Sequence, residues 1–325
     1  MRSERTYMSV TSGSLALILN ILLSYIIYTT RINTLGRYKH LLFLYTLSAA
    51  IYASNQILTA AEFVVCPSGY LMYDTINILP ISLAQVFIEN YAVCFIALIT
   101  IISWCFVYRY FVALRANRLD YLHQNWRVLA SATVLVMSIV LFCSLYSCFP
   151  RESYYQENRE PFSNLTGRDL NSTAYNCGPV MVGGVVNWQV YFGLSQFTAF
   201  IFVCGMVNIY CAVRIALFLR KSFAESNTAL KRQTRVFTLL MLQFVFPLTF
   251  NMMPVFLVFL AAYLHIPTMN LEIYVGPIVS IAQIIDPLLV YLFISDYRKT
   301  VRNLFRKERR VQPETQPEIT FSVNI

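Results

Sequence analysis

Two charged side chains lie inside long apolar segments of this chain, where a charge is costly unless it has a partner. The first is Arg109, which stands between Tyr108 and Tyr110 at the end of one such segment. An Arg at that depth in a membrane either extends its side chain to the surface or binds a partner. Two interpretations are open: a residue that simply ends a span, or a switch that is held inside in one state and released to a cytoplasmic partner in another.

The second charged side chain is Asp286, which is followed by Pro287 and then by Tyr291. A carboxylate at membrane depth indicates a functional site by default. Pro287 frees a backbone carbonyl one turn earlier, so the helix can bend at this point. The segment therefore predicts either a polar, bendable element of a two-state helix or a plain proline kink beside a hydrogen-bonded Asp.

Three further residues are candidates for function. Pro247 and Pro254 lie in one apolar segment and predict a double kink, which allows the inner half of that helix to swing as a unit. Glu89 lies 20 residues before Arg109, and at 1.5 Å per residue this separation is about 30 Å, the full hydrocarbon thickness. We expect Glu89 at the outer mouth, either as a ligand contact or as a solvated carboxylate.

These residues belong to elements that the composition places in a membrane. The chain has 325 residues, of which 57% are hydrophobic and 13% are charged, and this charged share is about half that of a soluble domain. A helical span needs about 20 apolar residues, and the apolar runs here are far too long for barrel strands. We predict an all-α integral membrane protein, a seven-transmembrane helix bundle formed by residues 1–295. The expected spans are about 8–29, 40–62, 81–108, 128–149, 188–213, 236–262 and 273–294.

The direction of threading can be inferred from the basic residues, because cytoplasmic loops retain Lys and Arg. Twenty of the 25 fall on one side of the expected spans, which predicts an N-terminus outside and a C-terminus in the cytoplasm. The same asymmetry accounts for the net charge of +9 without nucleic acid. Both N-glycosylation sequons, at Asn164 and Asn171, fall in the loop 150–187, which the charges place outside.

The segment after the last span predicts a surface helix. In residues 296–310, Tyr297, Val301, Leu304 and Phe305 recur on one face, with Arg and Lys between them. This pattern is typical of a basic amphipathic helix that lies on the inner membrane surface and contacts anionic lipid. Residues 311–325 are expected to be disordered.

This combination of elements resembles a G-protein-coupled receptor, and more narrowly the nematode serpentine chemoreceptors of the Str superfamily, of the Str and Srj type. The matching motifs are short, but they occur in order over nearly the whole chain. They are Leu35–Lys39, Phe106–Tyr110, Arg232–Phe237 with Gln243 and Pro247, Asp286–Leu288 and Ser295–Arg298.

The resemblance implies a function at each side of the membrane. It implies a chemosensory, olfactory-type receptor that binds a small, even volatile, ligand between the outer halves of its helices. It also implies a heterotrimeric G protein as partner in a cleft lined by Arg109, Lys231, Arg232 and Arg235, and a location in the plasma membrane, in particular that of a sensory cilium.

The chain departs from the receptor pattern in three places. Tyr108 stands where the acidic neighbour of Arg109 is usual, and Tyr291 is one residue farther from its Pro than in the NPxxY motif. No Cys lies near the outer end of the third span, where the common receptor disulfide begins. If a bridge to Cys177 exists, Cys66 is the first candidate partner and Cys148 the second.

Two other classes of membrane protein are alternatives. A ligand-gated channel of the insect odorant-receptor type also has seven spans, but its N-terminus is inside, which the charge distribution opposes. A small-molecule transporter needs several charges near the midplane, often in repeated broken helices. The chain also has no Walker loop, HExxH motif, nucleophile elbow or CxxC pair, so we expect no enzyme, no cofactor and no metal site.

Overall fold

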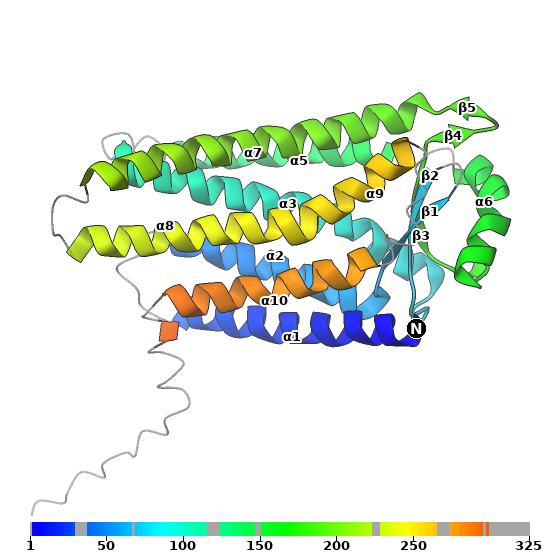
Figure 1. The fold of residues 1–325 in the computed structure, drawn as a ribbon, viewed down its shortest axis with the longest axis horizontal. Helices are drawn as coiled ribbons and strands as arrows, with labels where there is room; N and C mark the ends of the chain where they lie inside the picture. The colour runs from blue at the N-terminus through cyan, green and yellow to red at the C-terminus, as the bar shows by residue number, and fades with distance from the viewer. Residues whose placement is uncertain are drawn as a thin grey trace, which may run out of the picture.

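The computed structural model is a bundle of long helices with a small β-sheet across one end (Figure 1). Apolar runs form helices here because a helix satisfies its own backbone hydrogen bonds in lipid. We call the end of the bundle that carries the sheet the sheet end, and the other the opposite end. The residues described are 2–29, 38–66, 69–115, 124–146, 151–222, 228–264, 274–294 and 297–298.

Seven helical segments in the described part of the chain are long and apolar enough to cross a membrane, as the sequence predicted. The sixth consists of two helices joined by a five-residue π-helical turn. Several helices run past the expected boundaries by a few residues. The bounds are α1 (Arg2–Thr29), α2 (Tyr38–Thr59), α3 (Ile81–Leu114), α5 (Trp126–Tyr146), α7 (Trp188–Ser222), α8 (Thr228–Pro247) with η3 (Leu248–Met252) and α9 (Met253–Tyr263), and α10 (Val275–Phe293).

The seven helices differ widely in burial. Of the most apolar stretch of α3, 67% of the residues are buried, whereas only 6% are buried in α5. A helix that is apolar on every face belongs in the centre of a bundle, and α3 packs against α2, α5, α7 and α8. Because α3 continues to Leu114, Arg109 lies inside the helix and not at its end.

The second helix ends earlier than the sequence suggested. Helix α2 stops at Thr59, and Ala60 takes a positive φ of 39°, a conformation that rarely continues a helix. Glu62, expected as the end of the second span, instead begins strand β1 (Glu62–Cys66). A charged residue thus marked the boundary to within a few residues, but it did not reveal the strand.

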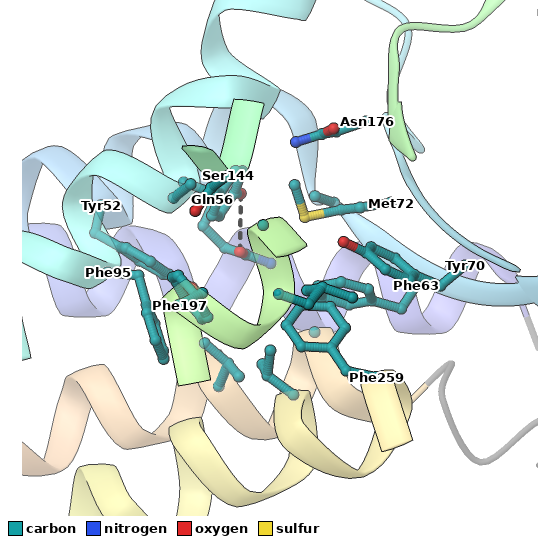
Figure 2. A pocket seen from close by; sticks show the side chains of 18 residues that line it. Tyr52, Gln56, Phe63, Tyr70, Met72, Phe95, Ser144, Asn176, Phe197 and Phe259 are labelled. Atoms are coloured by element: carbon teal, nitrogen blue, oxygen red, sulfur yellow. Dashed lines mark hydrogen bonds between the residues drawn. The ribbon is translucent and has the colours of Figure 1, made fainter. Parts of the chain in front are cut away.

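The sheet at the sheet end has three antiparallel strands in the order β1, β2 (Gly69–Tyr73), β3 (Tyr175–Pro179). Its register pairs Phe63 with Met72 and Met72 with Asn176. Side chains alternate between the two faces of a strand, so these three share one face, and Figure 2 shows them directed toward the helices. The sheet therefore closes that end of the bundle with an apolar surface.

The other face of the sheet is covered by α6 (Arg151–Thr166) and the short η2 (Leu170–Ser172), as Figure 1 shows at the right of the view. Phe162 of α6 is fully buried there, with its ring 5.2 Å from that of Tyr73. A second hairpin, β4 (Met181–Val182) with β5 (Val185–Val186), leads into α7. Residues 151–187, together with strands β1 and β2 and the turn after β2, therefore form a folded cap over the helices.

Candidate functional site

A cavity of about 110 Å³ lies inside the bundle at the sheet end, and we call it the aromatic cavity. Helices α2, α3, α5, α7, α9 and α10 and the inner face of the sheet surround it (Figure 2). None of its lining residues, all of them described, carries a charge. They are Tyr52, Gln56, Ala61, Phe63, Tyr70, Met72, Tyr91, Ala92, Phe95, Ser144, Asn176, Gly193, Leu194, Phe197, Val255, Phe259, Gly276 and Val279.

The ring of Phe259, on α9, joins the sheet to the helices of this cavity. Its centroid lies 4.7 Å from that of Tyr70 and 6.5 Å from that of Phe63, both on the sheet. It also lies 6.4 Å from Phe197 on α7, which in turn stacks 5.7 Å from Phe95 on α3. These separations fall in the range of favourable aromatic pairs. A molecule that enters the cavity therefore contacts α3, α7, α9 and the sheet through one set of rings.

Two glycines allow backbone and rings to approach closely around the cavity. A Cβ at Gly178 of β3 would lie 2.1 Å from the ring of Tyr70, so only Gly permits that ring to lie over the strand. A Cβ at Gly276 of α10 would lie 2.8 Å from the carbonyl oxygen of Ala61. The absence of these two side chains lets the sheet and α10 close over the cavity.

The cavity holds one hydrogen-bond donor without a partner among the described residues. The hydroxyl of Tyr91 donates to Oε1 of Gln56 at 3.0 Å, the bond drawn dashed in Figure 2. Gln56 is 2% exposed, and its Nε2 is buried with no acceptor. An unpaired buried amide is costly, so this N–H group lacks a partner that an acceptor on a bound molecule could supply.

Glu89 does not belong to this cavity. It lies on α3, half-buried, and accepts a hydrogen bond from Nε2 of Gln85 at 2.8 Å. It is absent from the lining residues. Glu89 lies in the half of α3 nearer the sheet end, whereas the aromatic cavity is lined by uncharged side chains.

A group of buried polar residues lies deeper in the bundle, where α1, α2 and α10 meet. Asp286 is 6% exposed, and its Oδ2 accepts a hydrogen bond from the hydroxyl of Tyr45 on α2. Nearby, Ser24 and Thr46 share a hydrogen bond of 2.8 Å, and Asn20 donates to the carbonyl oxygen of Gln283 at 3.5 Å, at the limit for such a bond. We call Asn20, Ser24, Tyr45, Thr46, Gln283 and Asp286 the polar cluster.

The polar cluster is only partly satisfied. Oδ1 of Asp286, Oδ1 of Asn20 and both side-chain polar atoms of Gln283 are buried without a hydrogen-bond partner among the described residues. Unpaired polar atoms are expensive in a low-dielectric interior. The polar cluster therefore has hydrogen-bonding capacity that the described residues leave unused.

Toward the opposite end, Arg109 packs against Tyr38 of α2. The guanidinium carbon lies 3.9 Å from the centre of the Tyr38 ring, which is a close cation–π contact. Tyr38 is fully buried and its ring also stacks 6.2 Å from Tyr108, while Tyr110 lies 6.0 Å from Tyr210 on α7. Arg109 therefore packs closely against an aromatic ring from another helix.

A repeat of tyrosines in the sequence marks one face of α2, although the sequence does not show which residues that face meets. Tyr38, Tyr45 and Tyr52 recur every seven residues of α2 and are at most 6% exposed. Seven residues make about two helical turns, or about 10 Å, so the three side chains lie along nearly one face. Tyr52 lines the aromatic cavity, Tyr45 binds Asp286 and Tyr38 holds Arg109.

Other sequence predictions lie partly outside the described residues. The backbone of Lys231, Arg232 and Arg235 is helical in α8, but their side chains are outside the described set, as is most of residues 296–310 and all of 311–325. Pro247 ends α8, and Pro254 lies in the first turn of α9. The two prolines therefore flank η3, and the structure has a single π-helical turn between them where the sequence predicted a double kink.

The proposed bridge between Cys66 and Cys177 does not fit the sheet. Strand β2 lies between the two cysteines, which pair with Gly69 and Leu71 of β2 respectively. Two strand spacings of about 4.8 Å separate their backbones by more than the ~7 Å that a disulfide can span. This prediction was wrong because Cys spacing in a sequence does not show which strand lies in between. Cys148, the second candidate, lies outside the described residues.

The cap also contains a buried carboxylate. Oδ1 of Asp74 accepts hydrogen bonds from the backbone N–H of Ile76 at 2.8 Å and of Asn77 at 3.1 Å. Arg168 donates to the carbonyl oxygens of Asp74 and Thr75. Burial raises the pKa of Asp74 above its ordinary value, and these amides and the charge of Arg168 offset only part of that rise. The asparagines of the two sequons, Asn164 and Asn171, are exposed on the same cap.

Comparison with known proteins agrees with this architecture over nearly the full chain. The profile of the family described as serpentine type 7TM GPCR chemoreceptor Str matches residues 5–302. The G-protein coupled receptor str-33 of Caenorhabditis elegans is 24% identical over 312 residues, which cover 89% of this chain and 87% of that protein. The serpentine receptor class r-10 of Caenorhabditis briggsae is also 24% identical, over 332 residues that cover 93% of this chain and 91% of that protein.

Proposed function

The chain belongs to the Str family of serpentine seven-transmembrane chemoreceptors, and on this premise we propose that its ligand binds in the aromatic cavity. A receptor of this family is a multi-pass membrane protein with a chemosensory role, and the proposal concerns where and how this chain performs it. The observation that carries the proposal is the uncharged cavity between six helices and the sheet. Ligand pockets are typically apolar clefts with a few placed polar groups, and this cavity has that composition.

The size and lining of the cavity limit the ligand. A volume of about 110 Å³ is somewhat smaller than the ~150 Å³ of an apolar cavity that takes up benzene. A charged molecule would lose its hydration without gaining an ion pair from any lining residue. We therefore propose a small, neutral ligand that packs against Phe95, Phe197 and Phe259 and accepts a hydrogen bond from Gln56.

The ligand signal would reach the opposite end through α2 and the sixth helix. The ligand would contact Tyr52 on α2 and Phe259 on the sixth helix. It shifts the balance between the resting and the active receptor only if it binds these two states with different affinities. Helix α2 connects the cavity to Asp286 and Arg109 through Tyr45 and Tyr38. The π-helical turn η3 separates α9, which carries Phe259, from α8, and such turns often occur at functional sites.

The proposed output is activation of a G protein at the opposite end. Nε and Nη2 of Arg109 are buried with no hydrogen-bond acceptor among the described residues. In the active state α8 moves away and Arg109 leaves Tyr38, so that these donors and the basic residues of α8, Lys231, Arg232 and Arg235, become available to the G protein. This places the opposite end in the cytoplasm and the sheet end outside the cell.

The first experiment tests the ligand site. We expect a screen of neutral volatile molecules in cells that carry this receptor and a promiscuous G protein to yield an agonist. Gln56→Leu should then raise the agonist concentration for half-maximal response by about tenfold, because a buried hydrogen bond contributes about 1.5 kcal/mol. Gln189→Leu is the matched control, since Gln189 lies on α7 and does not line the cavity. Equal effects of the two variants would refute the assignment of the cavity.

The second experiment tests the orientation in the plasma membrane. Asn164 and Asn171 are exposed on the cap, so we expect glycans there and a glycosidase-sensitive mass that is lost in the Asn164→Gln, Asn171→Gln double variant. A C-terminal tag should be detected only after permeabilisation. A tag that is accessible on intact cells would reverse the orientation and favour the channel interpretation.

A further inference from the structure

A second apolar cavity, of about 510 Å³, lies between α7 and α9 beside the aromatic cavity. We call it the lateral groove. It shares two lining residues, Leu194 and Phe259, with the aromatic cavity. These two side chains are therefore the partition between the two spaces. The lining residues of the groove are Leu194, Ser195, Thr198, Ala199, Phe202, Phe256, Phe259 and Leu260.

The groove exists because α9 packs against η3 and the sheet rather than against α7. Among the described elements, α9 makes its main contacts with η3 and with strands β1 and β2. Tyr70 and Phe63 of the sheet approach Phe259 from that side. Helix α9 is thus drawn toward the sheet, and a space is left on its α7 side.

The groove faces the membrane. Phe202 is 65% exposed and Phe256 43% exposed, and these rings lie on helices that cross the hydrocarbon core. No residue that lines the groove carries a charge, and all of them are described. In a bilayer such a surface is in contact with acyl chains and with any apolar solute dissolved among them.

Access from the sheet end is restricted by the cap. The sheet directs Phe63, Tyr70 and Met72 into the aromatic cavity (Figure 2), and α6 covers its other face with the fully buried Phe162. Entry by that route requires movement of a folded sheet and a helix. Entry from the groove requires movement of two side chains, the partly exposed Phe259 and the buried Leu194, which is a smaller rearrangement than displacement of a folded sheet.

We propose that the lateral groove binds neutral, apolar molecules dissolved in the bilayer, which then pass Phe259 into the aromatic cavity. This inference rests on the proposed function of the aromatic cavity and adds the route by which the ligand reaches it. The receptor thereby samples the ligand concentration in the membrane, which for an apolar molecule exceeds that in water.

The test uses fluorobenzene, a neutral aromatic molecule that partitions into lipid, and the full-length receptor in nanodiscs. Fluorine NMR would measure both the bound fraction and the rate of exchange between bound and lipid-dissolved probe. Thr198→Trp fills the groove at a residue that lines the groove and not the aromatic cavity. Met206→Trp is the control, because Met206 is 51% exposed on the same helix and lines neither space.

We expect Thr198→Trp to slow exchange by about tenfold and to leave the bound fraction within about twofold, because an obstructed route changes entry and exit equally. Met206→Trp should change neither quantity. Exchange at the wild-type rate in Thr198→Trp would overturn the lateral route. Ala92→Phe, which fills the aromatic cavity, separates the two proposals. If Ala92→Phe leaves the bound signal intact, the cavity itself is not the binding site, and the proposed function fails together with the route.

Discussion

The two ends of this bundle are built from different kinds of interaction. At the sheet end the lining of the aromatic cavity is uncharged, and Phe259 packs against the rings of Tyr70 and Phe197. From the polar cluster toward the opposite end, the interior holds Asp286 and Arg109, each in contact with a tyrosine of α2. Apolar packing depends on shape summed over many weak contacts, whereas a buried charge depends on one or a few partners. The two regions therefore make different demands on the sequence.

Helix α2 is common to both regions. Its tyrosines at positions 38, 45 and 52 contact Arg109, Asp286 and the aromatic cavity in turn. If the two regions have separate roles, substitutions at Tyr38 or Tyr45 change the signalling without ligand or the stability of the receptor. Substitutions at the sheet end then change only the response to ligand.

The largest effect is expected from Tyr45→Phe. The substitution keeps the ring but leaves Oδ2 of Asp286 without its donor, and an orphaned buried group costs about 1–3 kcal/mol, or more if charged. We expect a lower melting temperature in detergent and less receptor at the cell surface. Tyr25→Phe is the control, since Tyr25 is 53% exposed on α1. Wild-type stability in Tyr45→Phe would show that Asp286 does not depend on a single partner.

Tyr38→Leu tests the contact that holds Arg109. A desolvated cation–π contact contributes about 2 kcal/mol, and each 1.4 kcal/mol is about a tenfold change in an equilibrium. Loss of the ring should therefore raise ligand-independent signalling by up to about 30-fold, limited by the fraction of receptor already active. Tyr38→Phe retains the ring and should stay near the wild-type level. If both variants signal alike, the ring is not what holds Arg109.

The charged positions were accessible from the sequence, and their partners were not. Arg109 and Asp286 stand out because a charge in an apolar run is costly whatever surrounds it. Tyr38 and Tyr45 become meaningful only when α2 is packed against α3 and α10, which is a contact between distant segments. The number of spans could be read from hydropathy for the same local reason. The sheet could not, because β2 pairs with β3, about 100 residues farther along the chain, and nothing local specifies that register.

The residues that line the aromatic cavity could not be identified from the sequence for the same reason. Its aromatic residues resemble many other residues in a chain with 24 Phe and 22 Tyr, and position alone separates those that line it. Glu89 drew attention as a charge near the outer mouth, yet the lining is uncharged. The sequence therefore singled out the buried charges of the bundle but not the residues that line its cavity.

Gly178→Ala tests the sheet end in isolation. The added Cβ would lie 2.1 Å from the Tyr70 ring, so the ring or the strand must move, and overpacking of this kind costs about 1–3 kcal/mol. We expect a weaker response to the agonist with unchanged basal signalling. Gly205→Ala is the control, because a Cβ there meets no atom within 4 Å. A rise in basal signalling in Gly178→Ala would contradict the expectation that changes at the sheet end affect only the response to ligand.

The smallest effect is expected from Asp74→Asn, which tests a charge in the cap, outside both regions. Burial raises the pKa of Asp74, so the folded protein retains this proton at pH values where the unfolded chain has released it. The neutral acid therefore stabilises the fold at acid pH, and this contribution is lost as the pH rises through the folded-state pKa. Asn keeps an acceptor for the amides of Ile76 and Asn77 and carries no charge, so the variant should melt at a slightly higher temperature at neutral pH. The difference should vanish as the pH falls toward the ordinary value of 3.8. If the variant also melts at a higher temperature in acid, the added stability comes from packing. Shape rather than charge would then determine the stability of the cap, as it does around the aromatic cavity.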